Sequence, residues 1–379
     1  MRVISLLAAV IGLAIIAALV VHFGVGLVFR SLLAIGFVGF AAVCAIQLLL
    51  IAAMGLAWWA LLPKMNPWAA IWARLVRDSA SEVLPLSQIG GYVLGARALA
   101  VAGVAASAAA ASTIVDVTLE FFAQLAYIAI ALLWLLYVAP HSPAAVPAAL
   151  GIVLGLGLAA GFVAAQRGGF GVLDRMAGAL GRGWAERTSA GAAALHTAIA
   201  EIYDWPSGIW SSFAIHLACW IGSAAQIWLA LRWMGQPRGF GAVLVIESLL
   251  YAVRSIAFAV PNAVGVQEGA YLMLGAGFGL PPETALALSL LKRARDFAIG
   301  VPVLSAYQLV ESGRLWRFAC RTGAGSAVCA NAKTPVIATG VSIHPPRRKR
   351  RDRPASFPTK YQGDTTMQEK SASYPLKLQ

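Results

Sequence analysis

Long apolar segments separated by short polar loops recur along most of this sequence. They cover residues 3–21, 32–62, 104–138, 145–165, 209–233, 240–260, 262–280 and 282–310. About 20 apolar residues in a helix cross the ~30 Å hydrocarbon layer of a bilayer, and most of these segments approach or exceed that length. The ten-residue alternation of membrane barrels is missing. The sequence therefore predicts an all-α, polytopic integral membrane protein with about eight transmembrane helices.

Composition supports this class. The 379 residues are 60% hydrophobic and only 12% charged, whereas about a quarter of the residues in an average soluble domain are charged. Residues 3–21 follow Met1 and Arg2 as the apolar part of a signal peptide would. Apolar sequence resumes at residue 32 without a clear small-residue cleavage site in between, so we expect a retained first span.

Positive charge is concentrated at the C-terminal end. The net charge is +13, and residues 314–379 hold thirteen Lys/Arg against three acids, a net +10. This segment is rich in Ala, Gly, Ser, Thr and Pro, which is typical of disorder. We expect a membrane domain over residues 1–313 and a basic, disordered cytoplasmic tail over 314–379 that lies near anionic lipid. Beside so many spans, we expect no nucleic-acid partner.

Basic residues also orient the predicted spans. They cluster in the loop 63–82, in the segment 166–208 and in the tail, while only Arg30 and Arg238 fall in the opposite loops. The positive-inside rule then places both termini in the cytoplasm. The segments 63–82 and 166–208 mix charged and apolar residues, with Trp68 and Trp72 beside Lys64 and Arg74 in the first. We expect both to be helices at the membrane surface.

Two of the apolar segments are interrupted. Pro85 and Gly95 interrupt residues 84–103. Pro261 comes directly before residues 262–280, and Gly265 lies near the start of that segment. Such interruptions are typical of re-entrant or discontinuous helices. Aligning Pro85 with Pro261, an offset of 176 residues, also pairs Asp116 with Lys292. In the predicted topology the helices after the two breaks run in opposite directions, which favours an inverted repeat of the kind found in transporters.

Ionisable side chains form stripes on three of the predicted helices. The stripes are Thr113, Asp116, Glu120, Gln124 and Tyr127; Glu247, Tyr251 and Arg254; and Lys292, Arg295 and Asp296, with Arg293 nearby. Each charge costs roughly 2.5 to 3.5 kcal/mol at mid-bilayer unless it meets a partner or water. We expect the acids Asp116, Glu120, Glu247 and Glu268 to neutralise Arg254, Lys292, Arg293 and Arg295. Such charges either line a polar groove or only fix the packing of helices.

Cysteines and histidines give no metal signature. Cys44, Cys219, Cys320 and Cys329 show neither CxxC spacing nor a disulfide framework, and the histidines are scattered. We expect no metal site and no cofactor.

Two blocks of the sequence carry a resemblance. "ESLLYAVRSIAFAVPNAVGVQEGAYLMLGAGFGLPPETALALSLLKRARDFAIGVP" and the upstream "EVLPLSQIGGYVLGARAL" resemble the hopanoid-biosynthesis-associated membrane proteins of L type. These belong to the superfamily of the lysylphosphatidylglycerol synthase transmembrane, or flippase, region. The resemblance covers about residues 1–313. It implies a bacterial inner-membrane protein that moves a lipid between leaflets or towards the outer membrane, with hopanoids as cargo and hopanoid-biosynthesis proteins as possible partners.

The resemblance and the stripes together give a candidate translocation site. Its residues are Gln88, Gly90, Gly91, Arg97, Asp116, Glu120, Glu247, Arg254, Gly265, Gln267, Glu268, Gly269, Lys292, Arg293, Arg295 and Asp296. In this hypothesis Glu268 accepts hydrogen bonds from a polyol or amine headgroup, and the arginines balance it or bind phosphate.

Two other classes of function remain open. A scaffold or assembly factor for hopanoid biosynthesis would need no polar groove. A membrane enzyme is less compatible with the sequence, because the tail is too short for a catalytic domain and no serine or paired-aspartate protease motif is present. We therefore expect a lipid translocator without catalytic residues.

Overall fold

A computed structural model describes residues 26, 30, 33–84, 87–138, 145–168, 182–257 and 260–322. The chain divides into the units Met1–Arg321 and Thr322–Gln379, and the fold is that of the first. Every regular element of the described residues is helical. The helices α3 (Gly36–Leu61), α6 (Ala106–Val138) and α10 (Pro206–Trp233) are long and apolar enough to cross a membrane. The all-α, polytopic membrane class is confirmed.

Other expected spans are helical with different lengths. The helices are α7 (Ala145–Gly168), α11 (Phe240–Ile256) and α13 (Pro282–Thr322), the last of which continues beyond the expected end at residue 310. The segment 262–280 instead forms a short 3-10 turn, η1 (Pro261–Ala263), followed by α12 (Val266–Gly277). α12 has 12 residues, which is about 18 Å and too short to cross the ~30 Å hydrocarbon layer. The expected span at 3–21 lies outside the described residues.

The segment predicted to lie at the membrane surface contains a buried helix, α4 (Pro67–Val83), and this corrects the sequence prediction. α4 begins where the Asn66 side chain caps it, with Oδ1 accepting from the N–H of Trp68 at 3.0 Å. Trp68 stays 73% exposed. The face that carries Ala70, Ala73, Arg74 and Arg77 is buried, because α4 packs between α3 and α5 (Ser87–Val101).

The other cytoplasmic segment of the prediction contains α9 (Arg182–Tyr203). Its last turns pack on α6, and Ile199 and Ile202 are buried in the same apolar cluster as Trp58 and Leu119. α9 is thus anchored to the helical bundle at its C-terminal end.

A run of left-handed backbone separates α11 from α12. Asn262, Ala263 and Gly265 have φ angles of 49°, 45° and 82°, a region that only glycine adopts without cost. Gly265 is the N-cap of α12, and its N–H donates to the Glu268 carboxylate at 2.8 Å. The glycine and the acid therefore act together to start α12 directly after the break.

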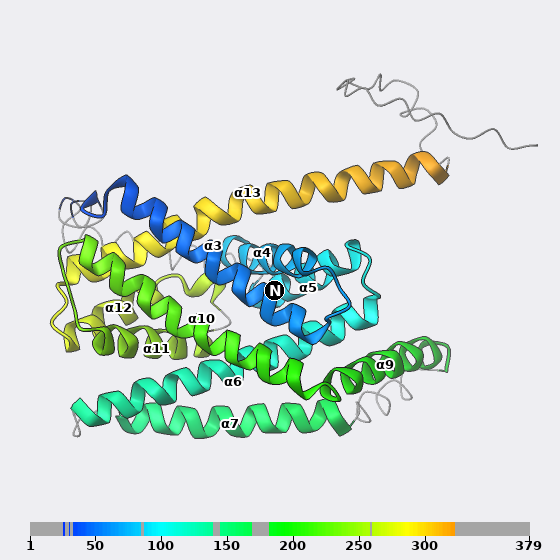
Figure 1. The fold of residues 1–379 in the computed structure, drawn as a ribbon, viewed down its shortest axis with the longest axis horizontal. Helices are drawn as coiled ribbons and strands as arrows, with labels where there is room; N and C mark the ends of the chain where they lie inside the picture. The colour runs from blue at the N-terminus through cyan, green and yellow to red at the C-terminus, as the bar shows by residue number, and fades with distance from the viewer. Residues whose placement is uncertain are drawn as a thin grey trace, which may run out of the picture. The chain divides into compact units, whose positions relative to one another are not determined.

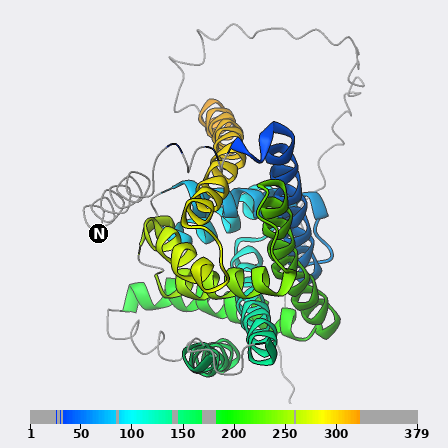
Figure 2. The ribbon, with the colours of Figure 1, turned by 90° about the vertical axis from the view of Figure 1, so that its left-hand side faces the viewer.

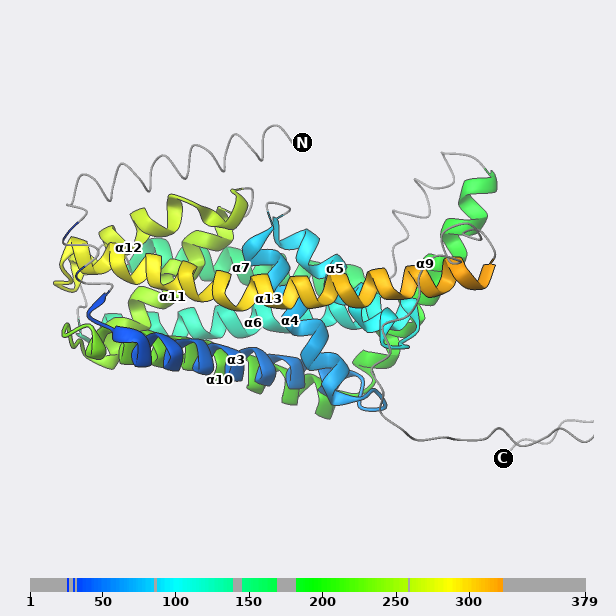
Figure 3. The same cartoon turned by 90° about the horizontal axis from the view of Figure 1, so that it is seen from above.

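The helices repeat in order along the chain. A shift of 176 residues moves the end of α5, Val101, onto the end of α12, Gly277, and the start of α6, Ala106, onto the start of α13, Pro282. In Figures 1 and 3, α6 runs opposite to α13, and α3 runs opposite to α10. Figure 2 shows α3 and α10 side by side, and they are in contact. This arrangement has the order and directions expected of an inverted repeat; Pro85 itself lies outside the described residues.

Close backbone contact holds the helices of the first repeat together. A Cβ atom added to Gly91 on α5 would lie 2.0 Å from Ser81 Oγ and 2.6 Å from the carbonyl oxygen of Arg77, both on α4. A Cβ atom on Gly55 of α3 would lie 2.6 Å from Ile71 Cα of α4. These glycines let α3 and α5 approach α4 from two sides.

The Gly91 contact gives a first prediction. Gly91→Ala should destabilise the protein by about 1 to 3 kcal/mol, because the added methyl group meets backbone that cannot move independently. The control is Gly157→Ala on α7, where no atom lies within 4 Å of the added Cβ. Thermal unfolding in detergent, followed by size-exclusion chromatography, measures both. Equal loss of stability in the two variants would contradict the close packing of α5 on α4.

Candidate functional site

A cavity of about 600 Å³ lies between the two repeats. α3, α4, α5 and α6 contribute residues from the first repeat, and α10, α11 and α13 contribute residues from the second. Leu158 and Phe162 of α7 form part of its wall. The charged residues that line it are Arg74, Arg77, Asp78, Glu82, Glu120, Arg254, Arg295 and Asp296. Four positive charges thus face four negative charges.

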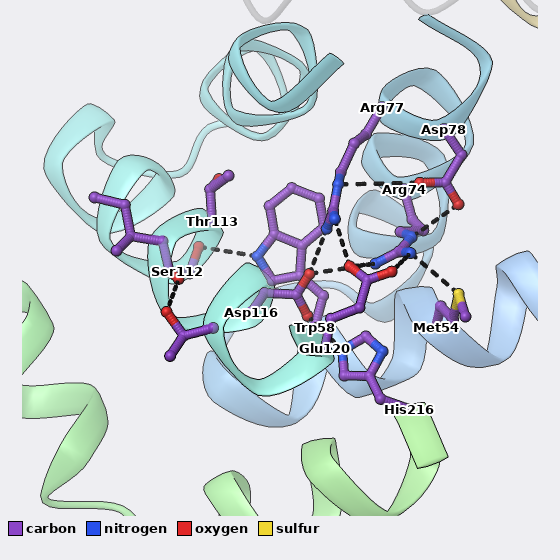
Figure 4. Close-up of polar contacts among 12 residues, drawn as sticks. Met54, Trp58, Arg74, Arg77, Asp78, Ser112, Thr113, Asp116, Glu120 and His216 are labelled. Atoms are coloured by element: carbon purple, nitrogen blue, oxygen red, sulfur yellow. Dashed lines mark hydrogen bonds and ion pairs between the residues drawn. The ribbon is translucent and has the colours of Figure 1, made fainter. Parts of the chain in front are cut away.

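Two arginines of α4 meet two acids of α6 at one side of this cavity (Figure 4). Arg74 Nη2 lies 2.6 Å from Glu120 Oε1, and Arg77 Nη1 lies 2.6 Å from Asp116 Oδ2. Arg77 also pairs with Glu120, and Arg74 Nη1 lies 3.3 Å from Asp116 Oδ2. Each carboxylate therefore contacts both guanidinium groups, a charge-assisted geometry that fixes α4 against α6.

Three more residues complete this α4–α6 cluster. Asp78 accepts from Arg74 Nε at 2.9 Å, one turn along α4. Met54 of α3 accepts through its sulfur from Arg74 Nη2 at 3.1 Å. His216 of α10 lies with Nε2 3.0 Å from Asp116 Oδ1, so the cluster contacts four helices, α3, α4, α6 and α10.

Aromatic rings cover the Arg77 guanidinium. Its Cζ lies 4.6 Å from the centre of the Tyr92 ring and 6.0 Å from that of Trp58, distances typical of cation–π contacts. Trp58 is held by a hydrogen bond from Nε1 to Ser112 Oγ at 3.1 Å. Gly91 and Gly95 bring α5, and with it Tyr92, close to this arginine.

A second contact joins the two helix breaks. Arg254 of α11 donates through Nη2 to both oxygens of Glu82 at 2.9 and 3.0 Å. Asn262, in the break before α12, donates to the carbonyl oxygen of Glu82 at 2.6 Å. Glu82 lies at the end of α4, just before the first break. This Glu82–Arg254–Asn262 contact connects the first repeat with the second at the edge of the cavity.

Arg295 and Asp296 of α13 also line the cavity. Arg295 Nε and Nη2 donate to Asp296 Oδ1 at 2.9 and 2.8 Å. Nη1 donates to Gln226 Oε1 of α10 at 2.7 Å, and Gln226 in turn donates to the carbonyl oxygen of Val43 on α3. The arginine therefore links α13 to α10.

Acidic groups are the more accessible charges in this cavity. The four arginines are between 2% and 10% exposed, whereas the four carboxylates are between 13% and 28% exposed. The net formal charge of the lining is zero, but among its charged side chains the carboxylates are the more exposed. Hydrogen-bond donors on a headgroup fit such a surface better than phosphate does.

Several predicted site residues lie away from the cavity. Lys292 Nζ lies 2.8 Å from Glu247 Oε2, and Tyr271 donates to the same carboxylate. Lys292 also lies 4.8 Å from the centre of the Tyr251 ring. This buried group fixes α13 against α11 and α12. The sequence predicted only that four acids and four bases would neutralise one another as a set, and the structure makes Glu247 and Lys292 one pair of that set.

Glu268 is also buried and fully occupied. Arg293 Nε lies 2.6 Å from Glu268 Oε1, and Ser289 donates to the same oxygen at 2.9 Å. The N–H of Gly265 donates to Glu268 Oε2. Gln267 donates to Ser289 at 2.8 Å. The pairing with Arg293 was expected, but no oxygen of Glu268 faces the cavity, so its predicted contact with a headgroup is replaced by a role in helix capping.

The remaining predicted residues have varied positions. Arg97 is 54% exposed and pairs with Glu311, away from the cavity. Gly90 and Gly91 lie in α5 against α4, and Gly269 in α12 has open space around it. The side chain of Gln88 lies outside the described residues. Asp116 is buried directly behind Glu120.

Sequence reasoning missed the basic partners of the α4–α6 cluster. It assigned Arg74 to a surface helix and paired Asp116 and Glu120 with arginines of the last helices, which is wrong. A signal was present, since Ala70, Ala73, Arg74 and Arg77 recur every three to four residues on one face of α4. No comparable pattern in the sequence pointed to His216 or Glu82.

Fold and site together define a polytopic helical membrane protein with a charged cavity lined by helices from both halves of the described chain. The family model described as "Lysylphosphatidylglycerol synthase TM region" matches residues 5–303. The chain therefore belongs to this lipid-related membrane family. Comparison with curated proteins and with solved structures finds no match.

The α4–α6 cluster gives a second prediction. Arg77→Met should lower the free energy of unfolding by about 3 to 5 kcal/mol, because it leaves the buried Asp116 and Glu120 with too little positive charge. Arg97→Met is the control, and the loss of its exposed pair with Glu311 should change the free energy of unfolding little. Denaturant titration in mixed micelles measures both. A cost for Arg77→Met no larger than the control would show that the cluster does not hold α4 on α6.

Proposed function

We propose that this protein moves a polar-headed lipid between the two leaflets of a bacterial inner membrane. The cavity between the repeats is the observation that carries this proposal. It is polar on the side of the Glu82–Arg254–Asn262 contact and apolar on the side of α7, where Leu158 and Phe162 are 74% and 50% exposed. A headgroup would bind the charged side while its apolar body stays in the bilayer beside α7.

The inverted repeat supports alternating access. In transporters with this symmetry, the substrate site lies where the repeats meet, and the two halves exchange conformations around it. The Glu82–Arg254 ion pair bridges the two repeats, so its release would let them move apart on one side. Both termini would be cytoplasmic, as the basic loops favour.

The cargo that fits best has hydroxyl or amine donors rather than a bare phosphate, because carboxylates dominate the accessible charge. A hopanoid with a polyol headgroup, or a related polar lipid, matches this chemistry and the resemblance of the two sequence blocks. The protein would act by binding and conformational change, without a catalytic step.

A non-catalytic scaffold for hopanoid-biosynthesis proteins is the second candidate. The Glu247–Lys292 and Glu268–Arg293 pairs favour it, since both are buried outside the cavity and act only in helix packing. A scaffold would need the rigid bundle but not an accessible cavity.

Lipid exchange in proteoliposomes distinguishes the two. A labelled hopanoid or phospholipid is supplied, and its exposure to a membrane-impermeant quencher reports movement between leaflets. Arg254→Gln and Glu82→Gln should each slow exchange about 10-fold or more, the effect of losing roughly 1.5 to 3 kcal/mol of a charged hydrogen bond. Arg97→Gln, which breaks an exposed pair outside the cavity, should leave the rate unchanged.

Glu268→Gln separates binding from folding in the same assay. It removes the buried pair with Arg293, so the yield of folded protein should fall, while exchange per folded molecule stays near that of the wild type. No exchange by the wild-type protein, or equal rates in all cavity variants, would reject the translocator in favour of the scaffold.

A further inference from the structure

His216 has one ring nitrogen bound and the other without a partner. Nε2 lies 3.0 Å from Asp116 Oδ1, and both side chains are fully buried. Nδ1 has no hydrogen-bond partner among the described residues. Because Asp116 Oδ2 already accepts from Arg77 and Arg74, Asp116 is an anion that receives hydrogen bonds on both oxygens. Nε2 must then carry a hydrogen, which leaves Nδ1 as the atom that can gain or lose a proton.

A second unpartnered polar atom lies one helical turn away. Ser212 Oγ is buried and has no partner among the described residues. Residues four apart lie on the same face of a helix, so Ser212 and His216 point to the same side of α10. Buried polar groups are normally satisfied by protein or by ordered water. Among the described residues, Ser212 Oγ and His216 Nδ1 are thus two unpartnered polar atoms on neighbouring turns of α10.

The charges around His216 favour a proton there. α6 contributes Asp116 and Glu120, and α4 contributes Arg74, Arg77 and Asp78. Met54 and Trp58 of α3 add no charge, Cys219 of α10 donates to the carbonyl oxygen of Leu50, and Tyr92 of α5 covers Arg77. With His216 neutral, two positive and three negative groups leave one uncompensated negative charge in a buried cluster. One proton on His216 removes it.

We infer that His216 is a proton-binding site, loaded on Nδ1, and that this proton is coupled to headgroup binding in the cavity. The coupling part rests on the proposed function. Arg74, Arg77, Asp78 and Glu120 both surround His216 and line the cavity. A positive imidazolium beside Asp116 weakens the hold of Asp116 on Arg77 and Arg74, and so changes the charge that a headgroup meets. A bound headgroup that alters those contacts must alter proton affinity by the same free energy.

The proton site is tested first without transport. In a variant that keeps only His216 of the five histidines, ¹⁵N NMR in lipid nanodiscs reports whether one or both ring nitrogens carry hydrogen. Both should be protonated within the range in which imidazoles change charge, about pH 5 to 8. Asp78→Asn removes one negative charge from the cluster and should shift the midpoint to lower pH by about one unit. Glu311→Gln, far from the cluster, should not.

Two results would overturn the proton site. One is an imidazole that stays neutral down to pH 5 in folded protein. The other is an unchanged midpoint in Asp78→Asn, which would mean that the cluster charge does not control His216.

Coupling is tested in proteoliposomes with a pH gradient. Wild-type lipid exchange should change several-fold with the gradient, and His216→Gln, whose amide can still donate to Asp116, should lose this dependence while keeping exchange at a single pH. If lipid exchange by the wild-type protein does not depend on the pH gradient, the proposed coupling is rejected and the proposed translocator function is not. No exchange at all would remove the translocator and the coupling together, while the NMR titration still decides the proton site.

Discussion

Charge neutralisation in an apolar bundle is the constraint on which this structure depends. Arg74 and Arg77 are almost completely buried, and their charges are compensated because Asp116 and Glu120 face them at 2.6 to 3.3 Å. An unpaired charge at this depth would cost several kcal/mol. The pairing therefore forces α4 away from the membrane surface and against α6. Gly91 and Gly95 then allow α5 to pack closely on α4, and these helices form one wall of the cavity.

The second repeat also neutralises its buried charges in pairs, but with different residues. The offset of 176 residues places Lys292 at the position of Asp116, with the sign of the charge reversed. Its partner Glu247 comes from α11, just as Arg74 and Arg77, the partners of Asp116, come from α4. In the second repeat the Glu247–Lys292 and Glu268–Arg293 pairs do not line the cavity, whereas the Arg295–Asp296 pair does. The two halves thus share a way of packing, while the accessible charges lie mainly in the first half and at the contact between the breaks.

The predictions that succeeded were those that depend on local pattern. The length of the apolar segments predicted the helical membrane class, and prolines and glycines predicted the breaks between helices. The offset of 176 residues predicted the order in which the helices recur. Opposite charges predicted that Glu247 and Glu268 would be neutralised by bases of the set Arg254, Lys292, Arg293 and Arg295, and the structure pairs them with Lys292 and Arg293. The prediction for Arg74 was wrong because a helix with tryptophans and basic residues has the same sequence pattern at a membrane surface and inside a helical bundle. What separates the two cases is a carboxylate on another helix, more than forty residues away.

The sequence by itself determined that this chain must be a helical membrane protein with its charges gathered in pairs, because hydrocarbon tolerates neither unsatisfied backbone nor isolated ions. Only the tertiary structure decided which charges pair, and so which of them remain accessible. Glu268 caps α12 and pairs with Arg293, and Arg254 and Glu82 join the two halves. Within the part of the chain that the structure describes, His216 has a partner on one ring nitrogen only. These outcomes depend on distances between helices far apart in the chain, and no spacing along the sequence encodes such distances.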